Sequence, residues 1–315
     1  MRSVKNGRTA LLLIAMVAFA TLVFAQQTRD GSDLVPTGKG WGEKVDHAPP
    51  VRDAKTNGAS PFGSCSNGIC YHGGPVMGST PNIYYIWYGN WNSGGSNSSA
   101  TQTLLENFII GLNGSGYEAI NKTYGISGTA VTGAVNFGGS VSDGGTKTSL
   151  TDNDIQSIVA AHAGHDLALD TNAVYFVLTP TTVNESSGFC TQYCGWHTHG
   201  TIGGKDIKYA FVGNPDRCPS ACEMQSVGPN GNGNGGADGM ASIIAHEQEE
   251  AISDPDLNAW YDRRGEENAD KCAWTFGATS TASNGSVYNM TLGSREYLIQ
   301  QNWVNANGGF CALSH

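Results

Sequence analysis

The sequence is poor in charged residues and has no basic region. Asp, Glu, Lys and Arg together make up 14% of the 315 residues, and no stretch concentrates Lys and Arg among aromatic side chains. The formal net charge is −10, and three of the basic residues lie in an N-terminal stretch without acids. This composition excludes a coiled coil and a charge-driven disordered chain. It also argues against a nucleic acid or an anionic membrane surface as the partner.

Several motifs of common enzymes are absent as well. The chain has no G-x-S-x-G nucleophile elbow and no Gly-rich phosphate-binding loop that ends in Lys. Its eight cysteines are an even number, which leaves no obvious nucleophilic thiol. The chain does contain 39% hydrophobic residues, which is enough for a real core.

The N-terminus has the pattern of an export signal. Residues 1–8 are basic, residues 10–24 are apolar, and Val23 and Ala25 form a small-residue cleavage pattern. An uncleaved anchor helix is the alternative, but the apolar run is short for a span of about 20 residues. We therefore predict a signal peptide over 1–25 and an extracellular, periplasmic or cell-wall location. Residues 26–60 are polar and rich in Gly, Pro and Asp, which predicts a flexible leader or a pro-segment.

The cysteines support export, because an even count in an exported chain indicates disulfides. They form three sequence-local pairs and one distant pair: Cys65 and Cys70, Cys190 and Cys194, Cys218 and Cys222, Cys272 and Cys311. Local bridges within each pair and bridges exchanged between the two C-x₃-C pairs both fit this spacing. A zinc site built from the two C-x₃-C pairs is the weaker alternative in an oxidising location.

From about residue 61 onward, strand and helix patterns alternate. Strands are predicted at 83–89, 131–137, 173–179 and 208–212, helices at 101–112, from Thr151 onward and at 240–253, and strand-like pieces within 297–305. Asp238 is the expected N-cap of the last helix, and Pro255 ends it. We predict one disulfide-stapled α+β domain over 61–315, with helices layered on a mixed sheet in a three-layer-like arrangement.

The segment 245–256, AHEQEEAISDPD, carries the most specific chemical signal. On a helix, His246 and Glu250 are four residues apart and project from the same face. With Glu247 beside them they form H-E-x-x-E, the zincin-like H-E-x-x-H helix with Glu in place of the second His. Two such ligands can hold one ion while Glu247 polarises a bound water and accepts its proton. The flanking Ala and Ile residues predict a largely buried helix, so its ionisable groups need a metal or a structural polar network.

A cation needs at least one more protein ligand, and the acids that follow the helix provide candidates. Glu267 is the first choice and Asp270 the second, because a downstream carboxylate completes a helix-borne pair in known zinc sites. Asp254 is also within reach, one turn beyond Glu250. Zn²⁺ is the expected ion, with Ca²⁺ or Mn²⁺ as alternatives, because one imidazole among several carboxylates makes an oxygen-rich site.

A second pair of histidines lies in FCTQYCGWHTHG (189–200). In an extended backbone His197 and His199 face the same side, so the pair could supply ligands, a proton shuttle or an oxyanion donor. His199 is the better functional candidate of the two, and Tyr261 is a further candidate oxyanion donor. Near the end of the second helix, His162 and His165 are expected to be structural.

Several segments together resemble the EXORDIUM, or phosphate-induced protein 1, family. They are IYYIWYGNW (83–91), TDNDIQSIV (151–159), VYFVLT (174–179), GFCTQYCGWHTHG (188–200) and YAFVGNPDRCPSAC (209–222), followed by the Gly/Asn loop that leads into DGM. The resemblance spans about 80–275. It implies an exported cell-wall or extracellular protein, from a family whose plant members are linked to growth and nutrient responses without an established enzymatic activity.

Within that family, the chain resembles the microbial-type members. These often carry H-E-x-x-E followed by D-P, W-Y-D and G-x-E-x-x-D-x-C, whereas plant members lack H-E-x-x-E and keep the histidine that corresponds to His199. The resemblance therefore favours Glu267 and Asp270 as ligands.

Two functions are compatible with these patterns. The first is a secreted zincin-like metallohydrolase, with a peptidase as first choice and a peptide or cell-wall polymer as substrate. The second is a non-catalytic extracellular protein that binds carbohydrate through its Trp and Tyr side chains and uses the acidic helix as a structural ion or polar site.

Overall fold

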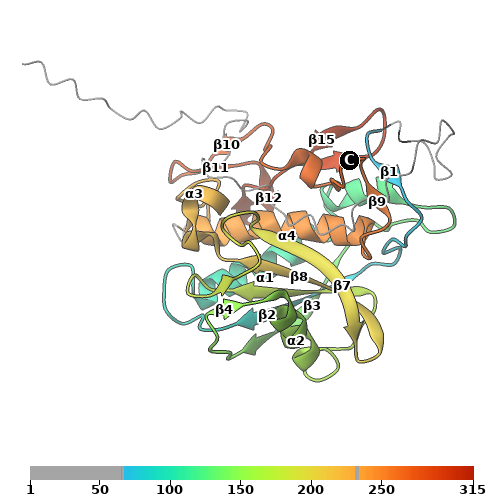
Figure 1. Ribbon diagram of the computed structural model, residues 1–315. Helices are drawn as coiled ribbons and strands as arrows, with labels where there is room; N and C mark the ends of the chain where they lie inside the picture. The colour runs from blue at the N-terminus through green and yellow to red at the C-terminus, as the bar shows by residue number, and fades with distance from the viewer. Residues whose placement is uncertain (1–64, 66, 231–233) are drawn as a thin grey trace, which may run out of the picture.

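The structure is a computed structural model that describes residue 65, residues 67–230 and residues 234–315 (Figure 1). The predicted signal peptide (1–25) and leader (26–60) lie outside the described residues. The rest of the chain forms an α+β domain, as the sequence predicted. Within the described part of the chain, no helix is both long and apolar enough to pass through a membrane.

A five-stranded sheet in the order β3-β2-β5-β8-β7 forms the centre of the domain. Its strands are β2 (Asn82–Tyr88), β3 (Asn136–Asp143), β5 (Ala173–Thr179), β7 (Gly195–Ile202) and β8 (Lys205–Gly213). All neighbours are parallel except β7, which pairs antiparallel with β8 at one edge. The sheet is therefore mixed, as predicted. The buried central strand β5 consists of Val, Tyr, Phe and Leu with small residues at its ends, the composition expected between two covering layers.

The predicted strands at 83–89, 173–179 and 208–212 are confirmed, but the prediction for 131–137 was wrong over 131–135. The strand β3 begins only at Asn136, whose backbone N–H donates to the carbonyl of Pro81. Before that point the neighbouring strand β2 has not begun, so the chain has no backbone with which to pair. Val131 and Val135 are nevertheless buried in the core.

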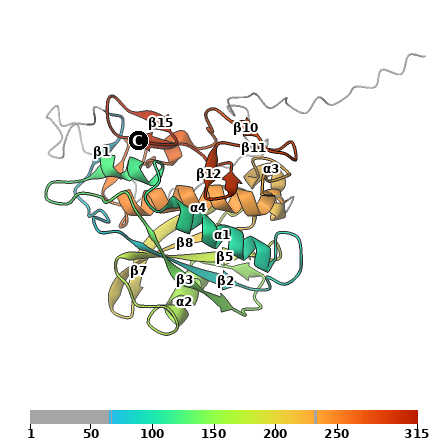
Figure 2. The ribbon, with the colours of Figure 1, turned by 180° about the vertical axis from the view of Figure 1, so that it is seen from behind.

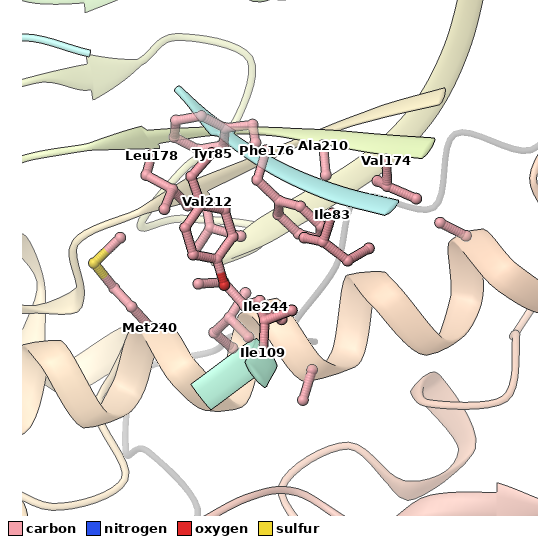
Figure 3. Packing of buried hydrophobic residues seen from close by; sticks show 14 of the residues in the cluster. Ile83, Tyr85, Ile109, Val174, Phe176, Leu178, Ala210, Val212, Met240 and Ile244 are labelled. Atoms are coloured by element: carbon pink, nitrogen blue, oxygen red, sulfur yellow. The ribbon is translucent and has the colours of Figure 1, made fainter. Parts of the chain in front are cut away.

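Helices cover both faces of the sheet (Figures 1 and 2). On one face lie α1 (Ser99–Leu112) and α4 (Gly235–Ser253), and on the other lies α2 (Asp152–His162). Thr151 caps α2 in a capping box with Asp154, so the helix begins where the sequence predicted. The core between the sheet and the two helices packs Met240 and Ile244 of α4 against strand residues such as Phe176 (Figure 3).

The helix α4 begins five residues before its predicted start. Its N-cap is Asn234 rather than Asp238, which lies inside the helix. In the sequence, Gly235 and Gly236 look like part of the preceding loop. In the structure they belong to the helix, and other segments pack against them too closely to leave room for a side chain. A Cβ atom on Gly235 would lie 2.3 Å from the carbonyl oxygen of Gln225, and one on Gly236 would lie 2.5 Å from the Asn214 side chain.

A further layer of short elements covers the side of α4 that faces away from the sheet (Figures 1 and 2). The remaining elements are β1 (Cys70–Tyr71), η1 (Glu118–Tyr124), β4 (Ser149–Leu150), β6 (Asn184–Glu185), η2 (Pro215–Arg217), α3 (Pro219–Cys222), β9 (Trp260–Tyr261), η3 (Asp270–Cys272), β10 (Ser280–Thr281), β11 (Val287–Tyr288), β12 (Met290–Leu292), β13 (Arg295–Tyr297), β14 (Asn302–Val304) and β15 (Phe310–Ala312). Of these, η1 and β13 contact α4 directly. The helix is therefore enclosed from both sides.

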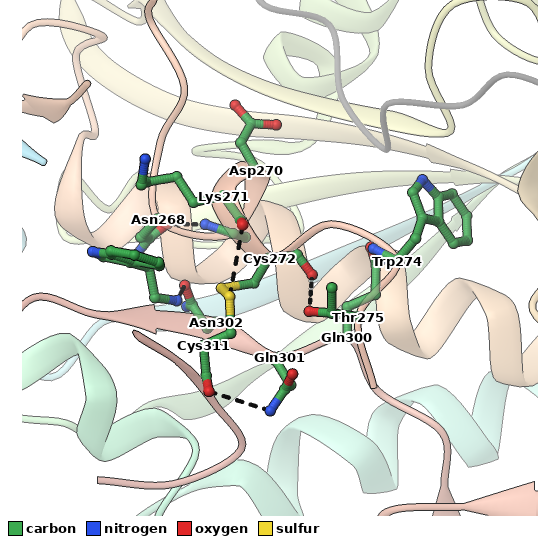
Figure 4. The surroundings of a disulfide bond; sticks show 12 residues. Asn268, Asp270, Lys271, Cys272, Trp274, Thr275, Gln300, Gln301, Asn302 and Cys311 are labelled. Atoms are coloured by element: carbon green, nitrogen blue, oxygen red, sulfur yellow. Dashed lines mark hydrogen bonds between the residues drawn. A yellow bond between two sulfur atoms is a disulfide. The ribbon is translucent and has the colours of Figure 1, made fainter. Parts of the chain in front are cut away.

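Four disulfides join all eight cysteines: Cys65–Cys70, Cys190–Cys218, Cys194–Cys222 and Cys272–Cys311. The two C-x₃-C pairs are thus bridged to each other, which was one of the two arrangements that their spacing allowed. These thiols are consequently not zinc ligands. Figure 4 shows the surroundings of the Cys272–Cys311 bridge, where the Asp270 side chain points away from the two sulfur atoms.

Candidate metal centre

Every residue of α4 is buried. A surface helix has a polar face in contact with water, but α4 lies between the sheet on one side and the short C-terminal elements on the other. Its ionisable side chains have therefore lost their hydration, and an unpaired buried charge is strongly unfavourable. The burial that the sequence predicted for this helix is confirmed, so its acids need partners within the protein or a bound ion.

Three of the predicted ligands converge on one point. The His246 Nε2 atom lies 3.1 Å from Glu250 Oε1 and 3.7 Å from Asp270 Oδ1. The backbone N–H of Asp270 donates to Glu250 Oε1 at 3.0 Å, which holds the start of η3 against the helix. One ligand atom from each of these residues lies within 4.8 Å of the others, so the three form a group that could hold a metal ion.

A second group adjoins the first and shares Glu250 with it. His197 from β7 brings its Nδ1 atom within 3.6 Å of Glu247 Oε2 and 3.7 Å of Glu250 Oε2. On the other side of the ring, His197 Nε2 lies 3.7 Å from Glu267 Oε2. Glu267, the first-choice third ligand from sequence, therefore lies beside His197, whereas Asp270 lies beside His246.

Asp254 and Tyr261 border this cluster. The Asp254 Oδ1 atom accepts the backbone N–H groups of Asn258 and Ala259, so this carboxylate stabilises the turn that follows α4. Tyr261 stacks on His72 with a centroid distance of 3.7 Å. Burial raises the pKa of the Tyr261 hydroxyl, and the charges of Asp254 and Glu267 raise it further.

His199 belongs to a different group of side chains. Its Nδ1 atom lies 2.8 Å from Asp206 Oδ1 and 3.8 Å from Asp256 Oδ1. The Lys208 Nζ atom contacts both of these aspartates and lies 2.8 Å from Asp256 Oδ1. A lysine thus supplies positive charge to this group, whose ion pairs are with Asp206 and Asp256 rather than with the α4 acids. His162, the last residue of α2, lies between Asp143 and Asp166.

Burial dominates the electrostatics of the central cluster. It raises the pKa of Glu247 and of Glu267 well above the usual range, and that of Glu250 to about 7. The neighbouring negative charges add to these shifts, while His246 lowers the pKa of Glu247 and of Glu250. For His246, burial disfavours the charged ring, but Glu250, Asp270 and Glu247 together raise its pKa well above the usual value. Burial and the neighbouring acids thus disfavour ionised carboxylates in the cluster, whereas the same acids favour a charged His246 ring.

Several polar atoms of the cluster have no hydrogen-bond partner, although they are fully buried. They are the Nδ1 atom of His246, both carboxylate oxygens of Glu247 and the Oε2 atom of Glu250. Buried polar atoms in folded proteins are almost always satisfied, so a group of unsatisfied ones indicates a missing partner. Imidazole nitrogens and carboxylate oxygens are ligand atoms for divalent cations, and the donor set fits such an ion.

The opposite side of α4 carries a second polar network that the sequence did not reveal. Gln248 Nε2 donates to Glu118 Oε2 at 2.7 Å, and Asn302 Nδ2 donates to Glu249 Oε2 at 2.7 Å. All four side chains are buried. Burial raises the pKa of Glu118 to about 8, so this carboxyl holds a proton at neutral pH. Amide donors and a shared proton balance the acids on this side, and no histidine takes part.

His197 is the main residue that sequence reasoning underestimated. It was ranked below His199, yet it is 1% exposed and faces the acids of α4. Gly195 provides the signal that could have indicated this. A Cβ atom at that position would lie 2.9 Å from Glu247 Oε1, so the glycine allows the start of β7 to approach the helix closely.

Comparison with known proteins gives a family and two relatives. The family model for the phosphate-induced protein 1 conserved region matches residues 69–311. Protein EXORDIUM-like 3 of Arabidopsis thaliana is 31% identical over 274 residues, which cover 74% of this chain and 79% of that protein. Protein EXORDIUM-like 5 of the same plant is 31% identical over 313 residues, which cover 84% of this chain and 83% of that protein. No solved structure matches the chain.

Proposed function

The chain belongs to the phosphate-induced protein 1 family, and from its buried acidic centre we propose that it is a secreted, metal-dependent hydrolase. Four disulfides in the described residues support a location outside the reducing cytoplasm. Within the family we propose a microbial-type member, because the chain carries H-E-x-x-E in α4.

One observation carries the proposal: two histidines and four acids from three separate segments meet in the interior. The α4 helix supplies His246, Glu247 and Glu250, the strand β7 supplies His197, and the segment that leads into η3 supplies Glu267 and Asp270. A protein that gained nothing from these groups would replace them with apolar residues, because a buried acid without a partner is destabilising.

We propose His246, Glu250 and Asp270 as the ligands of the ion, with Zn²⁺ as first choice and Mn²⁺ or Ca²⁺ as alternatives. Glu267 and Asp254 border the site and orient its members. When bound, such an ion lowers the pKa of a coordinated water and polarises a carbonyl group.

Glu247 is the proposed general base. It follows a proposed ligand directly on the helix, and burial raises its pKa well above the usual carboxyl range, which makes it a stronger base than an exposed glutamate. His197 lies against Glu247 Oε2 at 3.6 Å and fixes the orientation of this carboxylate. The Tyr261 hydroxyl is the proposed donor to the oxyanion, because it lies beside the acids at the end of the cluster.

The proposed substrate is a peptide or a cell-wall polymer that approaches from the side of Asp270. The Asp270 side chain is 6% exposed, whereas the side chains of His246, Glu247 and Glu250 are fully buried. The rim at Asp270 is thus the part of the ligand group that solvent reaches.

Replacement of the base tests the catalytic role separately from metal binding. We expect Glu247→Gln to retain the ion held by His246, Glu250 and Asp270 and to lower the rate of hydrolysis by about 10²–10⁴-fold, the usual contribution of a general base. The substrates would be a fluorogenic peptide library and soluble cell-wall polymers. Glu266→Gln is the matched control, since Glu266 precedes Glu267 of the cluster in the chain but pairs with Arg264. Full activity in Glu247→Gln would exclude its role as base.

A non-catalytic binding protein is the second candidate, and the burial of the centre favours it. His246, Glu247 and Glu250 are 0% exposed, so an ion held there is shielded in the manner of a structural site. This candidate predicts a wild-type protein that binds metal, is retained on an insoluble polysaccharide and cleaves none of the substrates above. Cleavage of any of them that disappears in Glu247→Gln would reject it.

A further inference from the structure

We propose that the cluster binds two divalent cations, with Glu250 as the carboxylate that bridges them. This inference rests on the proposed metal centre and adds a second ion to it. The first ion is held by His246, Glu250 and Asp270, and the second by His197, Glu247 and Glu250.

The two oxygens of Glu250 face different histidines. Glu250 Oε1 lies 3.1 Å from His246 Nε2, whereas Glu250 Oε2 lies 3.7 Å from His197 Nδ1. Each oxygen therefore belongs to a separate group of ligand atoms, and each group lies within 4.8 Å. A carboxylate that presents one oxygen to each of two such groups has the geometry of a bridge. Two-metal sites hold their ions about 3.5–4 Å apart, a span that one carboxylate covers.

The number of acids in the cluster also matches the charge of two divalent ions. Glu247, Glu250, Glu267 and Asp270 are four acids that surround two imidazoles in the interior. One divalent ion balances two carboxylates and leaves two others in a medium where unbalanced charge is costly. A second divalent ion balances the remainder. Asp254 is left out of this count, because two backbone N–H groups already donate hydrogen bonds to its carboxylate.

The second ion would satisfy the oxygens of Glu247. Both of its oxygens are buried without a hydrogen bond, and Glu247 Oε2 points to the His197 side of the cluster. Bound to the second ion through one oxygen, Glu247 keeps the other oxygen free to accept the proton of the attacking water. Its proposed role as base is thus retained.

The donor set matches the chemistry of carboxylate-bridged centres. Two histidines combined with four acidic residues form the sites of many di-iron and di-manganese proteins. One imidazole for each ion favours Mn²⁺, Zn²⁺ or Fe²⁺ over Ca²⁺, which prefers oxygen ligands only. Two such ions clamp both the attacking and the leaving oxygen of a hydrolytic reaction.

Metal counting on variants of the full chain tests the second ion. The protein is stripped with a chelator, reloaded with Mn²⁺ alone and desalted, and its metal content is measured by elemental analysis. We expect two Mn²⁺ for each wild-type chain and one for each chain in His197→Gln. The His165→Gln variant, which changes an exposed histidine, should keep two. Circular dichroism and thermal unfolding confirm that each variant is folded.

Electron paramagnetic resonance then shows whether the two ions are neighbours. A bridged Mn²⁺ pair gives a broad, exchange-coupled signal, and His197→Gln should convert it to the six-line signal of a single ion. One ion in the wild type would overturn the two-ion centre and leave the proposed hydrolase standing, whereas no ion would overturn both. Two uncoupled ions, or two ions retained in His197→Gln, would place the second ion elsewhere and also overturn the inference.

Discussion

At the scale of single residues, the acids of α4 are balanced in two different ways. Glu249 receives an amide hydrogen from Asn302 and lies beside the protonated Glu118. Glu247 and Glu250 instead face imidazole rings and have oxygens without any donor. Adjacent positions on one helix thus have different partners, with amide groups and Glu118 on one side and imidazole rings on the other.

The network around Glu118 should make stability depend on pH. The carboxyl has an ordinary pKa of 4.5 when exposed, and burial raises it to about 8 in the folded protein. Between these values the folded state holds a proton that the unfolded state has released, so the stabilising contribution present at low pH is lost as the pH rises. Glu118→Gln should therefore gain stability relative to wild type between pH 5 and pH 8, by on the order of 1–3 kcal/mol.

Urea unfolding at pH 5, 6.5 and 8, with a chelator present throughout, measures this difference. Because the chelator removes any bound ion, the comparison reports on the Glu118 side of the helix. Parallel pH profiles for wild type and Glu118→Gln would show that Glu118 does not hold the proton.

At the scale of elements, the centre depends on how closely β7 approaches α4. Gly195 opens β7, and a Cβ atom there would lie 2.6 Å from Ile243 Cγ2 and 2.9 Å from both Glu247 Oε1 and the carbonyl oxygen of Phe211. The strand and the helix can hold His197 against Glu247 only because this side chain is missing.

Substitution of this glycine should therefore damage both stability and metal binding. We expect Gly195→Ala to lower the free energy of unfolding by about 1–3 kcal/mol, as overpacked cores do, and to weaken cation binding by separating β7 from α4. Gly144→Ala is the control, because a Cβ atom at that exposed glycine meets nothing within 4 Å. Chemical denaturation and metal titration of the two variants provide the comparison. Equal effects of the two substitutions would contradict the close approach.

Sequence periodicity predicted which elements carry the site. It predicted the boundaries of those elements less well. The helical spacing of His246 and Glu250 was sufficient to place both on one face of α4, because that relation is local. The start of α4 was missed because Gly235 and Gly236 pack against residues of other segments, and this packing cannot be read from the local sequence. Whether Glu267 or Asp270 lies beside His246 depends on the turn before η3. The inward position of His197 depends on how the edge strand β7 pairs with β8. Neither relation is encoded in local spacing.

At the scale of the whole molecule, two disulfides hold the segments that deliver ligands to α4. Cys194, bonded to Cys222, precedes His197 by three residues, and Cys272, bonded to Cys311, follows Asp270 by two. The covalent framework thus restrains both segments that meet the helix. The cysteine count predicted such a framework, although its connectivity required the fold.

The central claim is that these segments assemble around a divalent cation. Anomalous diffraction from crystals of the full chain, collected above and below the absorption edge of the metal found by fluorescence, tests it most directly. The account predicts an anomalous peak within about 3 Å of His246 Nε2 that also contacts Glu250 and Asp270, and that is absent in His246→Ala. Crystals of metal-supplemented wild-type protein without any anomalous peak beside His246 would contradict the account.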